Sequence, residues 1–170
     1  CIVDETANIK LAARRIVFGK YLNCGQTCVA PDYILVERSV KDEFLVYLKK
    51  WIVRMYGADA TENDAYVKMI NQKHFDRVTG LIDPEKVIFG GGRNERTMQI
   101  QPTILDDVTA EDAVMQEEIF GPIFPILSVD SMAEAEEFIC KREKPLALYL
   151  FTQNKALAER FLRYVPFGGG

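Results

Sequence analysis

The sequence predicts an α/β fold with helices on both faces of a sheet, a three-layer α/β/α sandwich. Short apolar stretches typical of buried strands alternate with amphipathic stretches typical of helices through most of the 170 residues. Hydrophobic residues make up 48% and charged residues 27%, the balance of a globular chain that can bury a sizeable core. The length suits one domain, or at most two small ones.

The first half of the chain predicts strands and helices in turn. Apolar residues recur at helical spacing in three segments, and Ser39 with Asp42 resembles a capping box at the start of the second helix. Gly57 is expected to end that helix. In chain order, we expect a strand end at 1–3, helices at 7–20, from 39 to 57 and at 67–82, a turn at 23–28, a strand at 33–36 and a loop at 58–65.

The second half continues the alternation. Ser131 and Glu134 form a clear capping box, and Thr109 with Asp112 predicts a short capped helix. Pro166 is expected to stop the last helix. In chain order, we expect strands at 87–89 and 103–105, a helix at 109–116, a buried strand at 122–129, a helix from 131 to about 141, a strand at 146–151 and a helix at 155–165.

Charge and cysteine usage narrow the class of protein. The net charge of −4 does not favour a nucleic-acid partner, and no apolar run approaches the roughly 20 residues that span a bilayer. The start of the chain does not resemble a signal peptide. Four cysteines in a chain of this length favour a reduced, cytoplasmic setting. Both ends of the chain suggest an excised piece of a longer protein.

Cys28 is the residue most suited to nucleophilic chemistry. It follows a Gly-Gln-Thr turn between a predicted helix and a predicted strand, and free backbone N–H groups in such a turn favour the thiolate. Spacing alone nevertheless favours the alternative, a small buried and inert cysteine. Metal binding is not expected, because Cys24 and Cys28 are four apart, no C-x-x-C pair exists, and His74 is the only histidine.

Two other features are ambiguous on residue type alone. Gly90, Gly91 and Gly92 match no phosphate-binding pattern and predict a plain turn. Glu117 and Glu118 precede an apolar-Gly-Pro turn, which is typical either of a solvated helix end or of an aromatic ligand platform at Phe120.

Three segments resemble the aldehyde dehydrogenase family. The stretch 23–33, NCGQTCVAPDY, is similar to the segment that carries the family's nucleophile, and 117–122, EEIFGP, is similar to its second signature. The Ala-Pro-Asp-Tyr continuation and the stretch 70–78, INQKHFDRV, resemble the class 3 branch, which includes fatty and aromatic aldehyde dehydrogenases. The resemblance covers essentially the whole chain, and two motifs in the expected order make it specific.

The resemblance implies a role for each candidate residue. Cys28 would be the nucleophile that attacks an aldehyde, and its backbone N–H would help to bind the oxyanion. Glu118 would hold the nicotinamide ribose hydroxyls of NAD or NADP, and Phe120 would pack near the nicotinamide. His74 and Arg77 fall where some relatives have polar side chains that contact the cofactor. The expected reaction is oxidation of an aldehyde to a carboxylic acid through a thiohemiacetal and a thioester.

The resemblance also implies what residues 1–170 lack. The family's general-base glutamate lies in a Glu-Leu-Gly-Gly segment just before the counterpart of Cys1, and its oxyanion asparagine and cofactor-binding domain lie further upstream. The oligomerisation tail would follow Gly170, as would the membrane anchor of some class 3 relatives. We therefore expect a catalytic domain that is inactive alone and homodimeric in the full protein. The alternatives are a scaffold whose thiol is unused, and a relative that passes its acyl group to coenzyme A.

Overall fold

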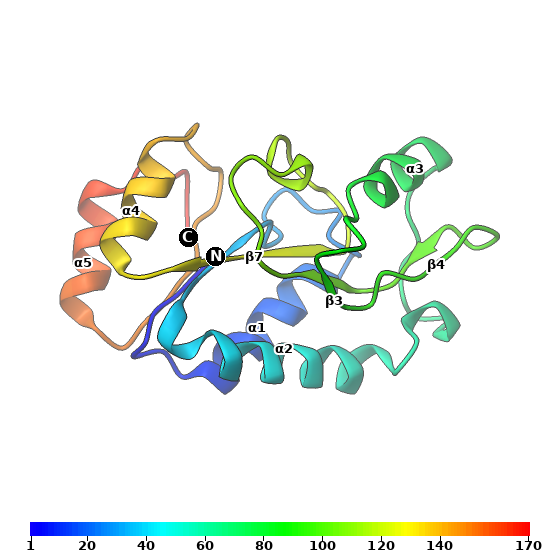
Figure 1. Ribbon diagram of the computed structural model, residues 1–170, viewed down its shortest axis with the longest axis horizontal. Coiled ribbons are helices and arrows are strands. Elements are labelled where there is room, and N and C mark those ends of the chain that lie inside the picture. Colours follow the sequence, from blue (N-terminus) through cyan, green and yellow to red (C-terminus); the bar gives the residue numbers. More distant parts are fainter.

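The computed structural model describes residues 1–170 and confirms the predicted α/β fold (Figure 1). The main sheet has six strands in the order β3-β6-β7-β2-β1-β8. Every neighbouring pair is parallel except β3 and β6, which are antiparallel. The strands are β1 (Ile2–Val3), β2 (Ile34–Glu37), β3 (Val87–Phe89), β6 (Thr103–Leu105), β7 (Ile123–Val129) and β8 (Leu150–Phe151).

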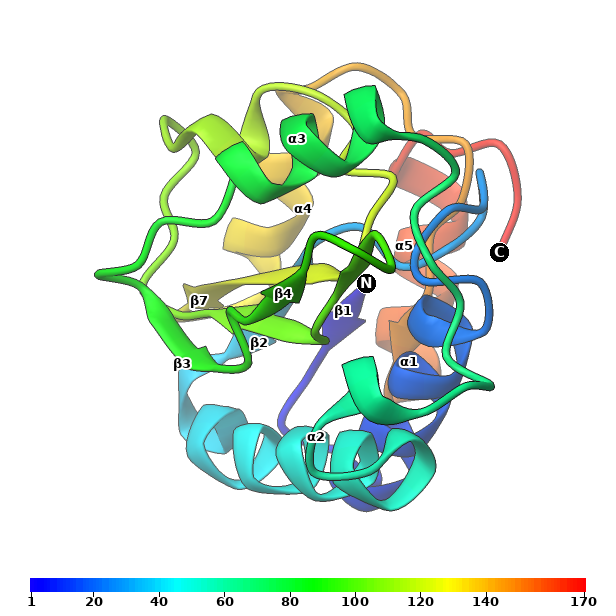
Figure 2. The same ribbon diagram turned by 90° about the vertical axis from the view of Figure 1, so that its right-hand side faces the viewer.

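Helices lie on both sides of this sheet. Helices α1 (Ile9–Tyr21) and α2 (Lys41–Tyr56) pack against each other beneath one face, whereas α4 (Met132–Cys140) packs against β7 on the other (Figures 1 and 2). Helix α5 (Lys155–Tyr164) is joined to α4 by the ion pair of Arg160 with Glu136. Helix α3 (Gln72–Gly80) lies on the side of the sheet away from α2 in both views. None of the helices is long and apolar enough to cross a membrane.

Side-chain caps fix where four of the helices begin. Asn8, Asn71, Ser131 and Asn154 each accept a hydrogen bond from a backbone N–H in the first turn of α1, α3, α4 and α5. The expected box of Ser39 with Asp42 was wrong. The chain instead enters α2 through a 3₁₀ turn, Arg38–Val40, and no side chain caps that helix.

Four other segments differ from the sequence expectation. The helix expected at 67–82 is shorter, because Met69 N–H bonds to the carbonyl of Met98 and the helix begins only after Asn71. The helix expected at 109–116 is a single 3₁₀ turn, Ala113–Met115, and the strand expected at 146–151 is only Leu150–Phe151. A two-stranded hairpin of β4 (Arg93–Asn94) and β5 (Gln99–Ile100) was not expected.

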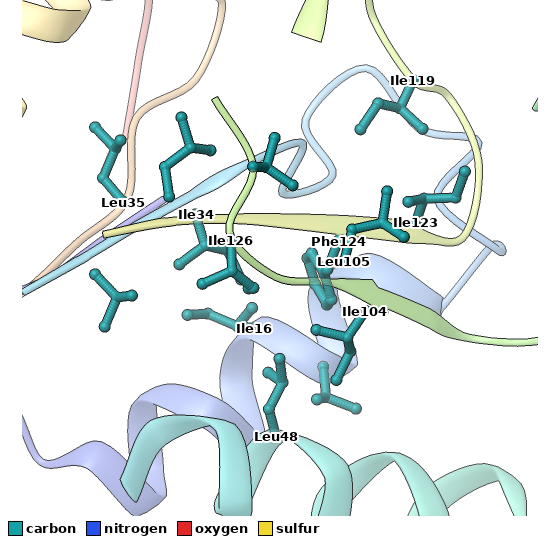
Figure 3. Close-up of a cluster of buried hydrophobic side chains, with 14 of the residues drawn as sticks. Ile16, Ile34, Leu35, Leu48, Ile104, Leu105, Ile119, Ile123, Phe124 and Ile126 are labelled. Carbon is teal, nitrogen blue, oxygen red and sulfur yellow. The ribbon is translucent and has the colours of Figure 1, made fainter. Parts of the chain in front are cut away.

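Much of the core lies between the sheet and the helix pair α1 and α2 (Figure 3), and buried residues of α3, α4 and α5 extend it on the other side. Ile16 of α1 and Leu48 of α2 point toward the underside of the sheet, where Ile34, Ile104 and Ile126 meet them. All five are at most 1% exposed, and burying a side chain of this size contributes about 1.5–3 kcal/mol. This packing holds the loops at the amino ends of the parallel strands in fixed positions.

Candidate active site

A cavity of about 680 Å³ opens at the amino ends of the parallel strands. Its wall includes the residues that begin β1 and β2, the segment before β8, and the segment that leads toward β7. Cys28 and Glu118 both line it, so the structure brings together the thiol and the carboxylate that the sequence singled out separately. Other lining residues are Asp32, Tyr33, Glu117, Arg142, Leu148 and Tyr149.

Cys28 is exposed, so the alternative of a buried, inert cysteine does not hold for it. It lies in the turn between α1 and β2, and its amide N–H donates to no acceptor in the chain. The turn passes through the left-handed region at Cys24 (φ 54°) and Gly25 (φ 74°). A free thiol beside an unused backbone donor can attack a carbonyl carbon and direct an N–H at the resulting oxyanion.

Side chains on both flanks hold the turn that carries Cys28. The amide group of Gln26 donates to the carbonyl of Lys68 (3.1 Å) and accepts from the N–H of Ile70 (2.9 Å). The hydroxyl of Tyr149 donates to the carbonyl of Val29 at 2.8 Å, directly after the cysteine. These contacts tie the turn to the segment before α3 and to the segment before β8. The backbone that carries the Cys28 thiol is therefore held on both flanks.

The loop 117–121, which we call the Glu118 loop, packs directly against this turn. A Cβ built on Gly25 would lie 2.1 Å from the carbonyl oxygen of Gly121, a distance that no side chain tolerates. Gly121 in turn faces Val78 of α3, whose Cγ1 would lie 2.6 Å from an added Cβ. Phe120, directly before Gly121, has φ 48°, a left-handed conformation that costs a non-glycine residue roughly 1–2 kcal/mol.

Hydrogen bonds reach the Glu118 loop from two sides. Asp32, just before β2, accepts a hydrogen bond from the N–H of Ile119 at 3.2 Å. Arg77 of α3 donates to the carbonyls of Glu118 (3.3 Å) and Ile119 (2.6 Å) and to the Glu117 carboxylate (3.0 Å). The Arg77 guanidinium therefore already donates its hydrogen bonds to acceptors within the chain.

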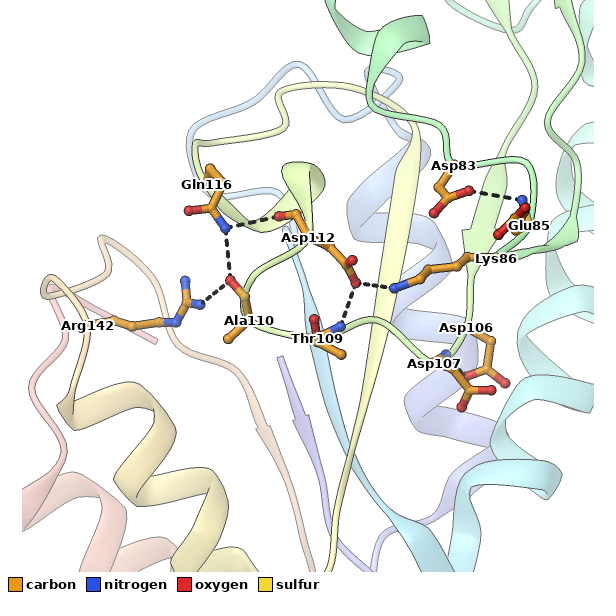
Figure 4. Close-up of polar contacts among 10 residues, drawn as sticks. All are labelled: Asp83, Glu85, Lys86, Asp106, Asp107, Thr109, Ala110, Asp112, Gln116 and Arg142. Carbon is orange, nitrogen blue, oxygen red and sulfur yellow. Dashed lines mark hydrogen bonds and ion pairs between the residues drawn. The ribbon is translucent and has the colours of Figure 1, made fainter.

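The segment before the Glu118 loop is fixed as well (Figure 4). Lys86 pairs with Asp112, whose carboxylate also accepts from the N–H of Thr109 at 2.7 Å. Arg142 donates to the carbonyls of Ala110 (3.2 Å) and Met115 (3.3 Å). Since Arg142 also lines the cavity, this network joins the cavity wall to the backbone that leads into Glu117.

Lys20 is a buried cation close to the site. Its side chain is 1% exposed, and its ammonium lies 5.1 Å from the centre of the Phe124 ring. Burial lowers the pKa of Lys20 to about 8, although the negative charges of Asp32 and Glu118 oppose that shift. A lysine on the buried face of an amphipathic helix was the sequence signal for this group, because Lys20 follows Ile16 by one helical turn.

The second cysteine of the turn has different surroundings. Cys24 is buried, and its thiol donates to the hydroxyl of Tyr66 at 3.4 Å, which donates in turn to the carbonyl of Ile100 at 3.0 Å. Burial raises the pKa of Cys24 to about 11, despite the opposing effects of its contact with the Tyr66 hydroxyl and of the charge of Lys20. Cys24 is therefore a protonated structural thiol, and the two cysteines of the turn differ sharply in solvent access.

The remaining predicted residues lie at the rim or outside the cavity. Glu118 is exposed and its carboxylate makes no hydrogen bond within the chain, so it is free to accept from two neighbouring hydroxyls, which is what a ribose offers. Phe120 is half-buried and does not line the cavity. His74 lies on α3 outside the cavity, and its Nδ1 is buried without a partner. Sequence reasoning missed Asp32, Gln26 and Tyr149 as supports of the site.

Comparisons with known proteins agree over the whole chain. The sequence profile of the aldehyde dehydrogenase family matches residues 1–169. The chain is 50% identical to the 4,4'-diaponeurosporen-aldehyde dehydrogenase of Staphylococcus aureus, over 99% of this chain and 37% of that protein. It is 47% identical to the dimeric NADP-preferring aldehyde dehydrogenase of Rattus norvegicus, again over 99% and 37%.

Solved structures give the same result. The substrate-bound state of Staphylococcus aureus AldH superposes with a TM-score of 0.97 at 49% identity, and covers 99% of this chain and 37% of that one. The NADP-dependent glyceraldehyde-3-phosphate dehydrogenase from Bacillus halodurans, solved with NADP, superposes with a TM-score of 0.88 at 29% identity, over 98% of this chain and 36% of that one. The chain thus spans little more than a third of the length of these proteins.

Proposed function

Because the chain belongs to the aldehyde dehydrogenase family, we propose that residues 1–170 are the nucleophile-bearing catalytic domain of an NAD(P)-dependent enzyme that oxidises an aldehyde to a carboxylic acid. The observation that carries this proposal is the meeting of the exposed Cys28 thiol and the exposed Glu118 carboxylate on one cavity. A scaffold with an unused thiol gives no reason for that arrangement.

Cys28 performs the covalent chemistry. Its thiolate sulfur adds to the carbonyl carbon of the aldehyde, and the carbonyl oxygen takes up the negative charge as a thiohemiacetal forms. The amide N–H of Cys28 has no acceptor in the chain and is available to that oxyanion. Loss of a hydride from the same carbon leaves a thioester, and water then releases the carboxylic acid and restores the thiol.

Glu118 and the Glu118 loop form one wall of the cofactor site. The bound nicotinamide cofactor, NAD or NADP, supplies the hydride acceptor. The free carboxylate of Glu118 would accept two hydrogen bonds from the ribose hydroxyls of the bound cofactor and so orient it beside the thiol. By the family resemblance, Phe120, on the same loop, would pack near the nicotinamide.

Selective alkylation tests the assignment of Cys28. In the full protein, we expect iodoacetamide to label Cys28 and to abolish aldehyde-dependent NADH formation, and Cys28→Ser to lower kcat by several orders of magnitude with an unchanged fold. Cys140→Ser is the matched control, because Cys140 is also exposed but does not line the cavity. Full activity in Cys28→Ser would remove the proposed nucleophile, and an intact wild-type protein without any activity would favour the scaffold instead.

The resemblance to class 3 relatives supports a proposal for the substrate and the oligomeric state of the full protein. We propose a medium- or long-chain aliphatic, or an aromatic, aldehyde as substrate, a homodimer, and a cytoplasmic location in which all four free cysteines stay reduced. A series of aldehydes of rising chain length, compared by kcat/KM, tests the substrate class. We also propose that residues 1–170 alone do not reduce NAD.

A further inference from the structure

We propose that Arg77 and Asp32 are positioning residues that hold the Glu118 loop in its cofactor-binding shape, and that Arg77 acts through this loop rather than on the cofactor. The inference rests on the proposed function of Glu118 and goes beyond it, because it gives Arg77 a different role from the cofactor contact that the sequence predicted.

The hydrogen bonds of Arg77 are the first support. Its two terminal nitrogens reach three oxygen atoms of consecutive residues: the Glu117 carboxylate at 3.0 Å, the Glu118 carbonyl at 3.3 Å and the Ile119 carbonyl at 2.6 Å. A planar guanidinium with several donors can hold consecutive carbonyls in this way, whereas an ammonium group is a point charge. Arg77 does not line the cavity, so its donors are directed at the loop from behind.

Asp32 completes the arrangement from the opposite side. It accepts a hydrogen bond from the N–H of Ile119 at 3.2 Å. Asp32 beside β2 therefore holds the N–H of Ile119, and Arg77 of α3 holds its C=O. Ile119 itself is fully buried, which keeps this backbone out of water. Glu118 lies directly before this fixed peptide and Phe120 directly after it.

The backbone of the loop explains why such a clamp is needed. Phe120 has φ 48°, and a non-glycine residue keeps that conformation only where its surroundings enforce it. The next residue, Gly121, is wedged between Gly25 of the cysteine turn and Val78 of α3. Val78 is the neighbour of Arg77, so α3 both supports the loop by packing and holds it by hydrogen bonds.

A double-mutant cycle on cofactor affinity separates the two roles of Arg77. In the full protein we expect Arg77→Met to weaken NAD and NADP binding by the same factor, on the order of tenfold, as measured by calorimetry. In a Glu118→Ala background the Arg77→Met change should have little further effect, because the loop no longer presents a carboxylate. Arg160→Met is the control, since Arg160 is an exposed arginine with one ion pair far along the chain.

Persistence of the full Arg77→Met effect in the Glu118→Ala background would overturn the proposal, as would an effect on NADP much larger than on NAD. Either result would mean direct contact with the cofactor. If Arg77→Met does not fold, Arg77→Lys takes its place. A smaller loss of affinity is then expected, because the ammonium can still donate to some of the three oxygens but cannot hold all of them.

Hydrogen exchange gives a readout that needs neither substrate nor cofactor. The Ile119 amide should be protected in the wild type, exchange at least tenfold faster in Asp32→Leu, and keep most of its protection in Asp32→Asn, which retains an acceptor oxygen. Unchanged exchange in Asp32→Leu would overturn the clamp. A wild-type protein that shows this protection pattern but no aldehyde oxidation would instead refute the proposed function and leave the clamp intact.

Discussion

Gly25 and Gly121 meet so closely that a single methyl group on Gly25 would lie 2.1 Å from the Gly121 carbonyl oxygen. Gly25 belongs to the turn that carries Cys28, and Gly121 belongs to the Glu118 loop. The contact therefore sets the separation between the proposed nucleophile and the proposed cofactor wall through two backbones, without any side chain that could change rotamer.

Gly25→Ala should disrupt both stability and activity. The new Cβ collides with backbone, and φ 74° is itself unfavourable for alanine, so we expect a loss of about 2–4 kcal/mol in the free energy of unfolding. Urea unfolding measures it. Gly80→Ala is the matched control, because nothing lies within 4 Å of its added Cβ, and we expect a change within about 1 kcal/mol. A Gly25→Ala protein as stable and active as wild type would contradict the role of this contact.

Tyr66→Phe should destabilise the fold modestly. It removes the hydroxyl that donates to the Ile100 carbonyl and accepts from the buried Cys24 thiol, which leaves both groups without partners. We expect a loss of about 1–2 kcal/mol in the free energy of unfolding. Tyr164→Phe changes the same atom on a side chain that is 63% exposed, and it should fall within about 0.5 kcal/mol of wild type. Equal effects of the two changes would mean that the buried hydroxyl contributes nothing.

Lys20→Met should change how stability depends on pH. Burial lowers the pKa of Lys20 to about 8 in the folded chain, against 10.5 as its ordinary value, so the unfolded chain binds more protons between these two pH values. The contribution of Lys20 to the free energy of unfolding therefore becomes more favourable as the pH rises from 8 to 10.5. The cost of burying the charged ammonium is present below pH 8 and is relieved above it. The size of this cost is on the order of 3 kcal/mol.

The measurement for Lys20 is the difference between wild type and Lys20→Met in urea unfolding at pH 7.5 and at pH 10. Subtracting the two free energies of unfolding cancels the contribution of the tyrosines, which also titrate at high pH, because both proteins contain them. We expect Lys20→Met to be the more stable protein at pH 7.5 and to lose that advantage by pH 10. A difference that does not vary with pH would show that Lys20 keeps its ordinary pKa.

Asp4→Ala should lower stability without affecting the thiol. Asp4 is 2% exposed, and its carboxylate accepts from the N–H and hydroxyl of Thr6 and from the hydroxyl of Thr152. Loss of these bonds should cost about 3 kcal/mol in unfolding free energy, and Asp4→Asn, which keeps an acceptor, should lose less. Because Asp4 follows β1, at the opposite end of the strands from the cavity, the rate of Cys28 alkylation should stay the same. A slowed rate would mean that the two ends of the sheet are coupled.

The sequence predicted the parts of the fold that local chemistry determines. The buried strand at 123–129 and the helix that Ser131 opens were both expected and found, since each has a strong local pattern. The extent of α3 was not predictable, because a backbone bond between Met69 and Met98 ends the extended segment and delays the helix. The hairpin of β4 and β5 has two residues in each strand, too few to give a period.

The candidate site, like the fold, was predictable only where local sequence determines it. Cys28 and Glu118 were singled out from their motifs, and their shared cavity depends on strand order, which no local pattern encodes. The hydrogen bond from the Ile119 N–H to Asp32 joins residues 87 positions apart. The family resemblance gave Arg77 a role in contacting the cofactor, whereas its position behind the Glu118 loop required the fold.

The cavity lies at the amino ends of β1, β2, β7 and β8, whereas open parallel sheets usually bind ligands at their carboxyl ends. None of the residues proposed above for the reaction lies in the connections at the carboxyl edge, such as the one that holds Asp4. We expect that edge to tolerate inserted residues or tags better than the edge that carries the cavity. Residues at the carboxyl ends of the strands should therefore vary more among relatives than residues at the amino ends. Engineering of a second function onto this domain should begin at the carboxyl edge.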